Sequence, residues 1–209
     1  MTLAQALFAF VIAAGLLTIT PGLDTLMILR TATIEGPRRA AFAAAGIGLG
    51  CLVWGAIVAL GIGAMLATAP MLFTLIRWAG AAYLAWIGIG LLLRPRDALS
   101  ANSEPFAAAG GGAAIWFRRG FLTNLLNPKM GVFYISFLPQ FVPHGYAAPG
   151  LIFLLACLHL VMGMLWLATL IVASLPLGRL LARPPVLRAL DRVTGGLFVA
   201  FGIRLAVTQ

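Results

Sequence analysis

Charged side chains are scarce in this sequence: Asp, Glu, Lys and Arg make up 9% of its 209 residues, whereas 62% are hydrophobic. A soluble domain carries roughly 25% charged residues. So few charges cannot cover an aqueous surface, which excludes a water-soluble globular protein and predicts an all-α integral membrane protein. The net charge of +9 would suggest nucleic-acid binding in a soluble protein. Because the basic residues here cluster in a few loops, we expect a lipid bilayer and no nucleic acid as partner.

Cysteine and histidine are also rare, with two of each. Cys51 and Cys157 lie inside apolar runs without metal-ligand spacing, so we expect them to pack rather than to bind a metal. His159 is a candidate proton relay, but we favour a neutral histidine hydrogen-bonded inside a helix bundle. No Ser-His-Asp grouping or phosphate-binding loop stands in a usable context. The sequence therefore predicts neither an enzyme nor a cofactor.

Six hydrophobic runs are long enough to cross roughly 30 Å of hydrocarbon. We predict spans at residues 3–29, 41–67, 71–93, 120–138, 146–175 and 193–207. The polar segment 94–119 contains prolines and a run of glycines, which indicates a linker. We therefore expect one membrane domain made of two three-helix repeats, residues 1–93 and 120–209, joined by that linker.

The arginines predict how the chain is oriented. The loops after the first, third and fifth runs contain three, four and four arginines, and the loops after the second and fourth contain none. Because cytoplasmic loops collect Lys and Arg, we expect the linker and the other two basic loops on the inner side of the bacterial cytoplasmic membrane and both termini on the outer side. Three spans per half turn the second half upside down relative to the first, which is the inverted-repeat architecture of many transporters.

Two of the runs are interrupted by proline next to a charged residue. The motifs are Thr20-Pro21-Gly22-Leu23-Asp24 in the first run and Asn127-Pro128-Lys129 in the fourth. Proline lacks a backbone donor and clashes with the preceding turn, so both helices should break here. Interrupted apolar segments at corresponding positions of two halves are the best pointer to the binding site of a transporter.

The charges beside the breaks are costly. Asp24 and Lys129 each cost about 2.5–3.5 kcal/mol at a helix centre. One interpretation is a buried Asp24–Lys129 pair that only locks two helices together. The other is a substrate or ion pathway, in which half-helix N-termini and Lys129 bind a carboxylate and Asp24 binds an ammonium group. A ligand carrying both groups is a zwitterion, hence an amino acid.

Other residues are predicted to line such a site. The polar and backbone candidates are Thr20, Pro21, Gly22, Asn124, Asn127 and Pro128. The aromatic candidates for the cavity wall are Trp54, Tyr83, Trp86 and Tyr134. Aromatic side chains in membrane spans more often pack or anchor at interfaces.

Several motifs together resemble a known family. They are Thr20-Pro21-Gly22-Leu23-Asp24, Ala81-Ala82-Tyr83-Leu84-Ala85-Trp86-Ile87-Gly88, Asn124-Leu125-Leu126-Asn127-Pro128-Lys129, Leu138-Pro139-Gln140-Phe141, Gly195-Gly196-Leu197-Phe198 and Phe201-Gly202-Ile203-Arg204-Leu205. In these stretches, and in size and span count, the chain resembles the lysine exporter (LysE/RhtB) family of bacterial amino-acid efflux transporters. The family commonly has a second proline where Leu23 stands here. The resemblance implies export of amino acids or related compounds, driven by the proton gradient.

A mechanism follows as a hypothesis from the acid at the first break. Asp24 takes a proton from the outer side and releases it when a substrate ammonium group arrives from inside, which gives proton-coupled alternating access. The alternatives are a membrane-embedded hydrolase using His159, for which the sequence offers no nucleophile or metal partner, and a channel or scaffold that does not transport. Glycine-rich faces in the second and sixth spans permit a homodimer but equally serve internal packing.

Overall fold

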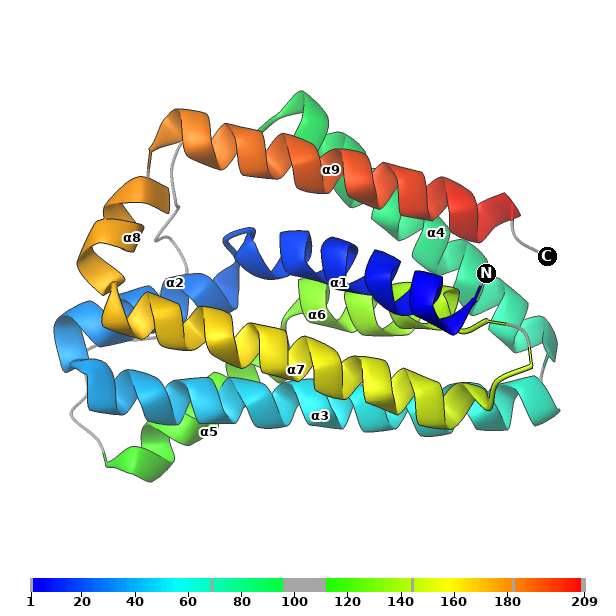
Figure 1. Cartoon of the computed structure of the whole chain (residues 1–209), viewed down its shortest axis with the longest axis horizontal. Helices are drawn as coiled ribbons and strands as arrows, with labels where there is room; N and C mark the ends of the chain where they lie inside the picture. The colour runs from blue at the N-terminus through cyan, green and yellow to red at the C-terminus, as the bar shows by residue number, and fades with distance from the viewer. Residues whose placement is uncertain (1, 69, 96–111, 144, 182, 208–209) are drawn as a thin grey trace.

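The computed structural model describes residues 2–68, 70–95, 112–143, 145–181 and 183–207, and all regular elements in them are helices (Figure 1). They run in the order α1 (Leu3–Ile19), α2 (Leu23–Arg30), η1 (Thr31–Glu35), α3 (Pro37–Thr68), α4 (Pro70–Leu93), α5 (Ala113–Leu125), α6 (Pro128–Val132), η2 (Phe133–Phe137), η3 (Leu138–Phe141), α7 (Ala148–Val172), α8 (Ser174–Leu181) and α9 (Pro184–Val207). Elements η1 and η2 are π-helical and η3 is a 3-10 turn. The predicted all-α class is confirmed for these residues.

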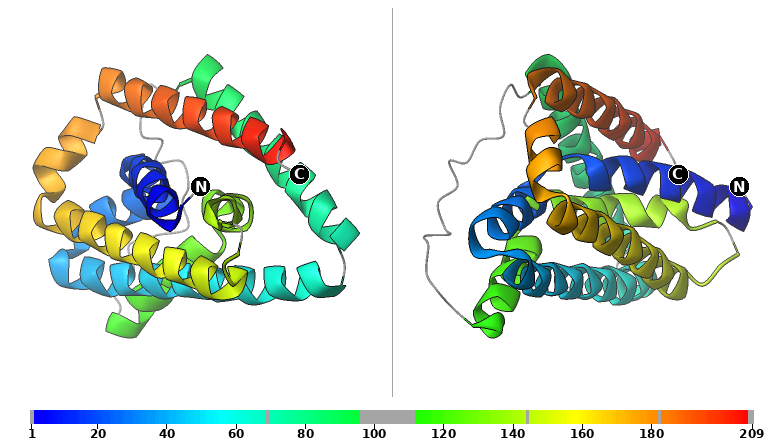
Figure 2. Two further views of the ribbon diagram at one scale, coloured as in Figure 1. Left: turned by 45° about the vertical axis from the view of Figure 1, so that its right-hand side comes forward. Right: turned by 60° about the vertical axis from the view of Figure 1, so that its left-hand side comes forward.

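Helix α1 and the segment that follows Pro128 lie in the middle of the bundle (Figures 1 and 2). Helices α3, α5 and α7 pack together on one side, and α4 packs against α9 on the other. Helix α1 and the α6–η2 segment run between these two groups (Figures 1 and 2). The two interrupted segments are therefore neighbours at the centre, although they are distant in sequence.

The helix interruptions follow from the prolines. Helix α1 ends at Ile19 and α2 begins at Leu23, with a bend of 51° between them. Helix α5 ends at Leu125, and α6 begins with Pro128 as its first residue, where the missing N–H of proline costs nothing. Both interruptions therefore lie at the motifs that the sequence analysis singled out.

Some predicted boundaries are wrong. Helix α9, which contains the predicted last span, begins at Pro184 rather than at residue 193, and α8 fills part of the expected basic loop. Helix α5 begins at Ala113, within the expected linker, while residues 96–111 lie outside the described part. Arg118, Arg179, Arg188 and Arg192 sit on the exposed faces of helices, and hydropathy alone does not distinguish such a face from a loop.

The membrane-crossing capacity of the described helices can be judged by length and composition. Two helical stretches, Pro37–Gly61 and Ala148–Val172, are long and apolar enough to cross, and the bent pair Leu3–Ile19 and Leu23–Glu35 would be a third. The count of six spans therefore stays a prediction.

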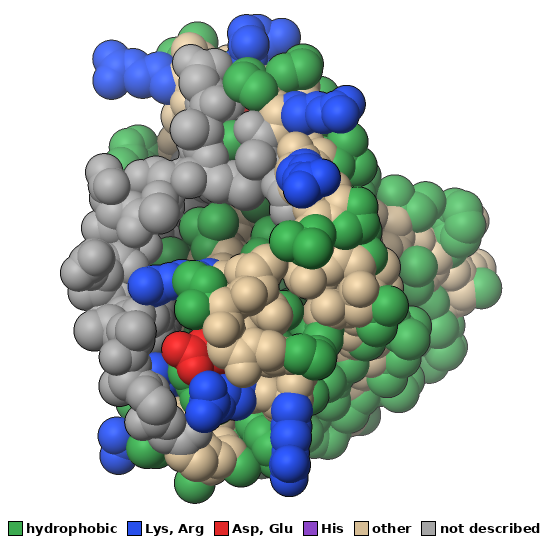
Figure 3. Space-filling view, turned by 90° about the vertical axis from the view of Figure 1, so that its left-hand side faces the viewer, with side chains coloured by type: hydrophobic (Ala, Val, Ile, Leu, Met, Phe, Trp, Pro, Cys, Tyr) green, Lys and Arg blue, Asp and Glu red, His purple; other side chains and the backbone are tan. Residues whose placement is uncertain are grey.

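Arginine side chains gather at one end of the bundle, where α2 leads into α3 and where α8 joins α7 to α9 (Figure 3). At this end Arg39 forms an ion pair with Glu35, with 2.6 Å between Nη1 and Oε2. The start of α1 and the end of α9 lie at the opposite end (Figure 1).

The interior consists of two apolar clusters. The larger one is built around packed aromatic rings: Phe10 meets Phe141 edge-to-face with 5.4 Å between the ring centroids, and the tilted pair Phe137–Phe141 lies 4.9 Å apart. The second cluster lies nearer the arginine-rich end and includes Met27, Ile47, Trp116, Leu167 and Leu170. The pocket described below takes lining residues from both clusters.

Glycine permits an unusually close approach of α3 and α5. A Cβ on Gly46 would overlap the backbone carbonyl of Phe117, and a Cβ on Gly120 would overlap that of Ala43. On the other side of the bundle, Gly195 of α9 faces the backbone of α4 in the same way. The glycine faces of α3 and α9 therefore serve internal packing, and the homodimer stays a prediction.

This packing gives a first test. We expect Gly46→Ala to lower the stability of the protein in detergent by about 1–3 kcal/mol, because the added methyl group pushes two backbones apart. The measurement is the midpoint of thermal unfolding. Gly61→Ala is the matched control on the same helix, because an added Cβ there meets nothing within 4 Å. Equal midpoints for the two variants would contradict the close crossing.

Candidate functional site

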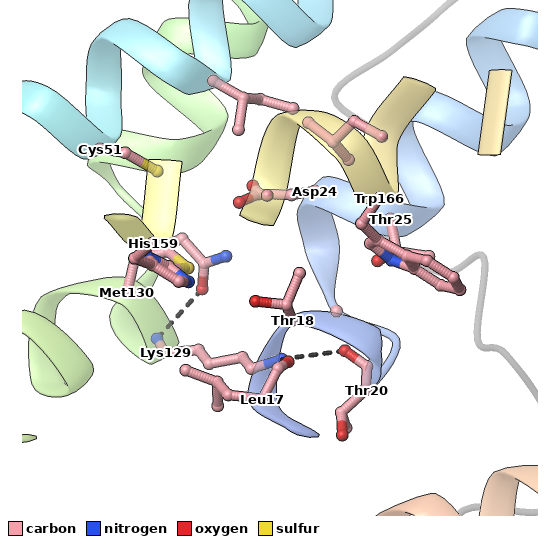
Figure 4. Close-up of a pocket in the computed structure, with 15 residues that line it drawn as sticks. Leu17, Thr18, Thr20, Asp24, Thr25, Cys51, Lys129, Met130, His159 and Trp166 are labelled. Carbon is pink, nitrogen blue, oxygen red and sulfur yellow. Dashed lines mark hydrogen bonds between the residues drawn. The ribbon is translucent and has the colours of Figure 1, made fainter. Parts of the chain in front are cut away.

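A pocket opens beside the break between α1 and α2, against α6 and one face of α7 (Figure 4). Its empty volume, open mouth included, is about 500 Å³. The residues that line it are Leu17, Thr18, Thr20, Gly22, Asp24, Thr25, Ile47, Cys51, Asn127, Lys129, Met130, His159, Gly163, Trp166 and Leu167. Asp24 and Lys129 thus share one hollow with both interruptions.

Lys129 compensates for the backbone donor that Pro21 lacks. In a continuous helix the N–H of residue 21 would bond to the carbonyl of Leu17, but proline has no N–H. The Lys129 ammonium donates to that carbonyl at 3.1 Å, and to the carbonyl of Thr20 at 3.0 Å (Figure 4). Its side chain passes over Gly22, where a Cβ would lie 3.5 Å from Nζ. A cation at the carbonyl end of α1 also suits the helix dipole.

Asp24 is held by the other half of the chain. The side-chain amide of Asn124, on α5, donates to Asp24 Oδ2 at 2.8 Å. Asn124 is fully buried, and Gly50 of α3 makes room for it, because a Cβ on that glycine would lie 2.5 Å from Asn124 Oδ1. Asp24 lies in the first turn of α2, where a negative charge is favoured. Within the described residues, Asp24 Oδ1 and Asn124 Oδ1 are buried acceptors without a hydrogen-bond donor.

Asn127 organises the second break. It is the N-cap of α6, and its side-chain oxygen accepts a hydrogen bond from the Lys129 N–H at 3.0 Å. This bond satisfies one of the donors that every helix start exposes. By contrast, Gly22 caps α2 without any side-chain bond. The N-terminus of α2 is therefore the less satisfied of the two half-helix ends.

Most of the predicted polar residues meet in this pocket. Thr20, Gly22, Asp24, Asn127 and Lys129 line it directly. Of the other three predicted residues, Pro21 is buried at the first break, and Asn124 lies behind Asp24. The third, Pro128, begins α6, and its side chain lies outside the described part.

The predicted aromatic residues lie elsewhere. Trp54 packs on Gly131, Tyr134 is fully buried, and Trp86 is 70% exposed on α4. None of the three is among the residues that line this pocket, and the side chain of Tyr83 lies outside the described part. Their roles in packing and on the outer surface agree with the commoner functions of aromatic residues in membrane spans.

Sequence reasoning considered His159 but missed the other residues of α7 that line the pocket. His159, Gly163, Trp166 and Leu167 all line the pocket, and their spacing places them on one helix face. His159 also forms a hydrogen bond of 3.0 Å between its Nδ1 and the hydroxyl of Tyr134, so it is anchored in the bundle as expected. Cys51, expected only to pack, reaches the pocket beside Asn124. The spacing of these α7 residues, which places them on one helix face, was the feature of the sequence that could have identified this wall of the pocket.

Comparison with known proteins agrees with this geometry. The sequence model of the LysE type translocator family matches residues 3–209. The chain belongs to this family. Membership places this translocator among membrane transporters rather than enzymes and confirms the resemblance seen in its motifs.

Individual relatives cover nearly the whole chain. An uncharacterized membrane protein of Pseudomonas aeruginosa is 36% identical to this translocator over 207 residues, which cover 95% of this chain and 94% of the relative. A leucine efflux protein of Klebsiella pneumoniae is 31% identical over 206 residues, 96% and 94% of the two chains. A homoserine/homoserine lactone efflux protein of Salmonella typhi is 28% identical over 199 residues, 95% of each chain. No solved structure matches the chain significantly.

The cap at the second break can be tested by mutation. We expect Asn127→Ala to lower the stability in detergent by about 0.5–2 kcal/mol, because the first turn of α6 loses its side-chain cap. Thermal unfolding of the purified protein measures the change. Asn127→Ser, which keeps a capping oxygen, is the matched control and should retain most of the stability. Equal destabilisation by both substitutions would show that the cap contributes nothing.

Proposed function

We propose that this translocator exports amino acids or closely related zwitterionic metabolites across the bacterial cytoplasmic membrane by proton-coupled alternating access. The observation that carries the proposal is that Asp24 and Lys129 line one pocket between two broken helices. Relatives named for leucine and homoserine efflux support the class of substrate.

The substrate carboxylate is expected to bind where the N-terminus of α2 faces Lys129. Half-helix N-termini favour anions through their N–H groups and their partial positive charge. Because Asn127 already caps α6, whereas Gly22 leaves α2 without a side-chain cap, the first break is the better carboxylate site. The substrate ammonium group is expected to bind Asp24, whose Oδ1 is a buried acceptor without a protein donor in the described residues.

Binding at Lys129 would change the geometry of the break. Its ammonium group donates to the carbonyls of Leu17 and Thr20, so an incoming carboxylate competes with these two acceptors. When the ammonium group turns to the substrate, the carbonyl end of α1 loses those bonds and the angle between α1 and α2 is free to change. Substrate binding is thereby coupled to a movement of half a span, as alternating access requires.

Asp24 supplies the coupling to protons. A proton and a substrate ammonium group neutralise the same carboxylate, so the two cannot occupy it together. Entry of a proton from outside then displaces the substrate, and arrival of substrate from inside displaces the proton. The net result is exchange of one for the other.

The proposed topology has six spans in two inverted repeats: α1 with α2, α3 and α4 in the first, and α5 with α6, α7 and α9 in the second. The arginine-rich end of the bundle lies in the cytoplasm, and both termini lie outside. The clustering of arginines at one end and the position of α1 and α9 ends at the other support this orientation (Figures 1 and 3). The linker between the repeats then lies between the end of α4 at Leu93 and the start of α5 at Ala113.

The coupling role of Asp24 can be tested in proteoliposomes loaded with radiolabelled amino acids. We expect Asp24→Asn to reduce gradient-driven efflux about tenfold or more, because the amide binds neither a proton nor an ammonium group as a carboxylate does. Glu35→Gln is the matched control, since Glu35 lies at the arginine-rich end and pairs with Arg39. Undiminished gradient-driven efflux by Asp24→Asn would remove Asp24 from the coupling step.

The role of Lys129 is tested by equilibrium binding of the same amino acids to purified protein. A hydrogen bond to a charged group contributes about 1.5–3 kcal/mol, so Lys129→Met should raise the Kd about tenfold or more. Arg118→Met, which removes an exposed cation from α5, is the control and should leave the Kd unchanged. An unaltered Kd for Lys129→Met would favour the interpretation that the charge only holds the helices together.

A further inference from the structure

One wall of the pocket has an empty position. Gly163 lines the pocket on α7, and a Cβ added there would meet nothing within 4 Å. Glycines at helix crossings behave differently: a Cβ on Gly50 or Gly120 would run into Asn124 or into the backbone of α3. Gly163 is therefore not needed for helix packing, and the missing side chain enlarges the pocket.

The wall around Gly163 is apolar on one side. Trp166 and Leu167 follow it on the same face of α7, and Ile47 of α3 also lines the pocket. Ile47 and Leu167 belong to the apolar cluster nearer the arginine-rich end, against which Trp166 packs. A substrate group lying over Gly163 toward these residues would be surrounded by hydrocarbon and an indole ring.

The described lining of the pocket has one acid and one base for the two charges of a zwitterion, and these leave no charged partner for a substrate side chain. Among the described residues that line it, Asp24 and Lys129 are the two acidic or basic side chains besides His159, which is bonded to Tyr134. The ammonium and carboxylate groups of an amino acid would engage both. A charged substrate side chain would then be buried against the apolar wall without a partner, which is strongly unfavourable.

Resting on the proposed function, we propose that the transported amino acids are neutral with an apolar side chain, which lies over Gly163 against Ile47, Trp166 and Leu167. Gly163 is the residue that sets the largest side chain accepted. Larger residues at this position narrow the pocket from the α7 side while leaving Asp24 and Lys129 in place.

The test is a size series at Gly163 in the full-length protein reconstituted in proteoliposomes. Wild type, Gly163→Ala, Gly163→Val and Gly163→Leu are compared for efflux of leucine and alanine. We expect the leucine-to-alanine ratio of kcat/KM to fall stepwise, by about tenfold or more for Gly163→Leu, because one methylene group changes discrimination by 10–200-fold. The Ala variant adds a single methyl group and keeps the test valid if the larger variants fail to fold.

Gly150→Leu is the matched control. Gly150 lies on the same helix, a Cβ there also meets nothing within 4 Å, and it is not among the lining residues. This control should keep the wild-type ratio. An unchanged ratio across the Gly163 series, an equal loss of both substrates in folded variants, or the same change in Gly150→Leu would overturn the role of Gly163.

A second arm separates this inference from the proposed function. Wild-type protein is tested with lysine, glutamate and leucine under the same gradient, and leucine should be exported with a kcat/KM at least about tenfold above the others. Export of lysine or glutamate as fast as leucine would overturn the apolar selectivity while leaving amino-acid export intact. Failure to export any amino acid would instead overturn the proposed function, and the selectivity with it.

Discussion

The rest of the structure depends on a backbone carbonyl that proline leaves without a donor. Pro21 removes the N–H that would bond to Leu17, and the Lys129 ammonium takes its place. Inside a membrane an unsatisfied carbonyl and an unpaired ammonium are each unfavourable, the latter by about 2.5–3.5 kcal/mol. Each compensates the cost of the other, so a broken helix and a buried charge that would be unfavourable alone are stable together.

Two donors of the second half of the chain hold the first break on its two sides. Asn124, which precedes the second break, donates to Asp24, which follows the first, while Lys129 after the second break donates to the end of α1. Both hydrogen bonds therefore run from donors in the second interrupted segment to acceptors in the first. The proposed transport cycle uses the same bonds: a zwitterion offers a carboxylate to Lys129 and an ammonium group to Asp24, and so competes with the groups that hold the breaks together.

Sequence reasoning was accurate where a residue has few possible roles. Proline inside an apolar run interrupts a helix in almost any context, so the interruptions beside Pro21 and Pro128 were foreseeable. It failed for arginine, which stands equally well in a loop or on the outer face of a helix, and α9 accordingly begins at Pro184 within an expected loop. Sequence reasoning did not distinguish whether Trp54 and Tyr134 line the pocket, and they do not, because an aromatic ring in a span packs against helices as readily as it lines a cavity.

By itself, the sequence determined the membrane class, the two helix interruptions at proline, the charges beside them and the family. Only the tertiary structure decided which groups satisfy the charges, and that His159, Gly163 and Trp166 of α7 face the pocket. The physical reason is that lipid is as apolar as a protein core, so the inward and outward faces of a span carry similar side chains. The hydrophobicity of a membrane-spanning helix therefore differs little between its faces. The face that points inward becomes known only from the packing of the helices.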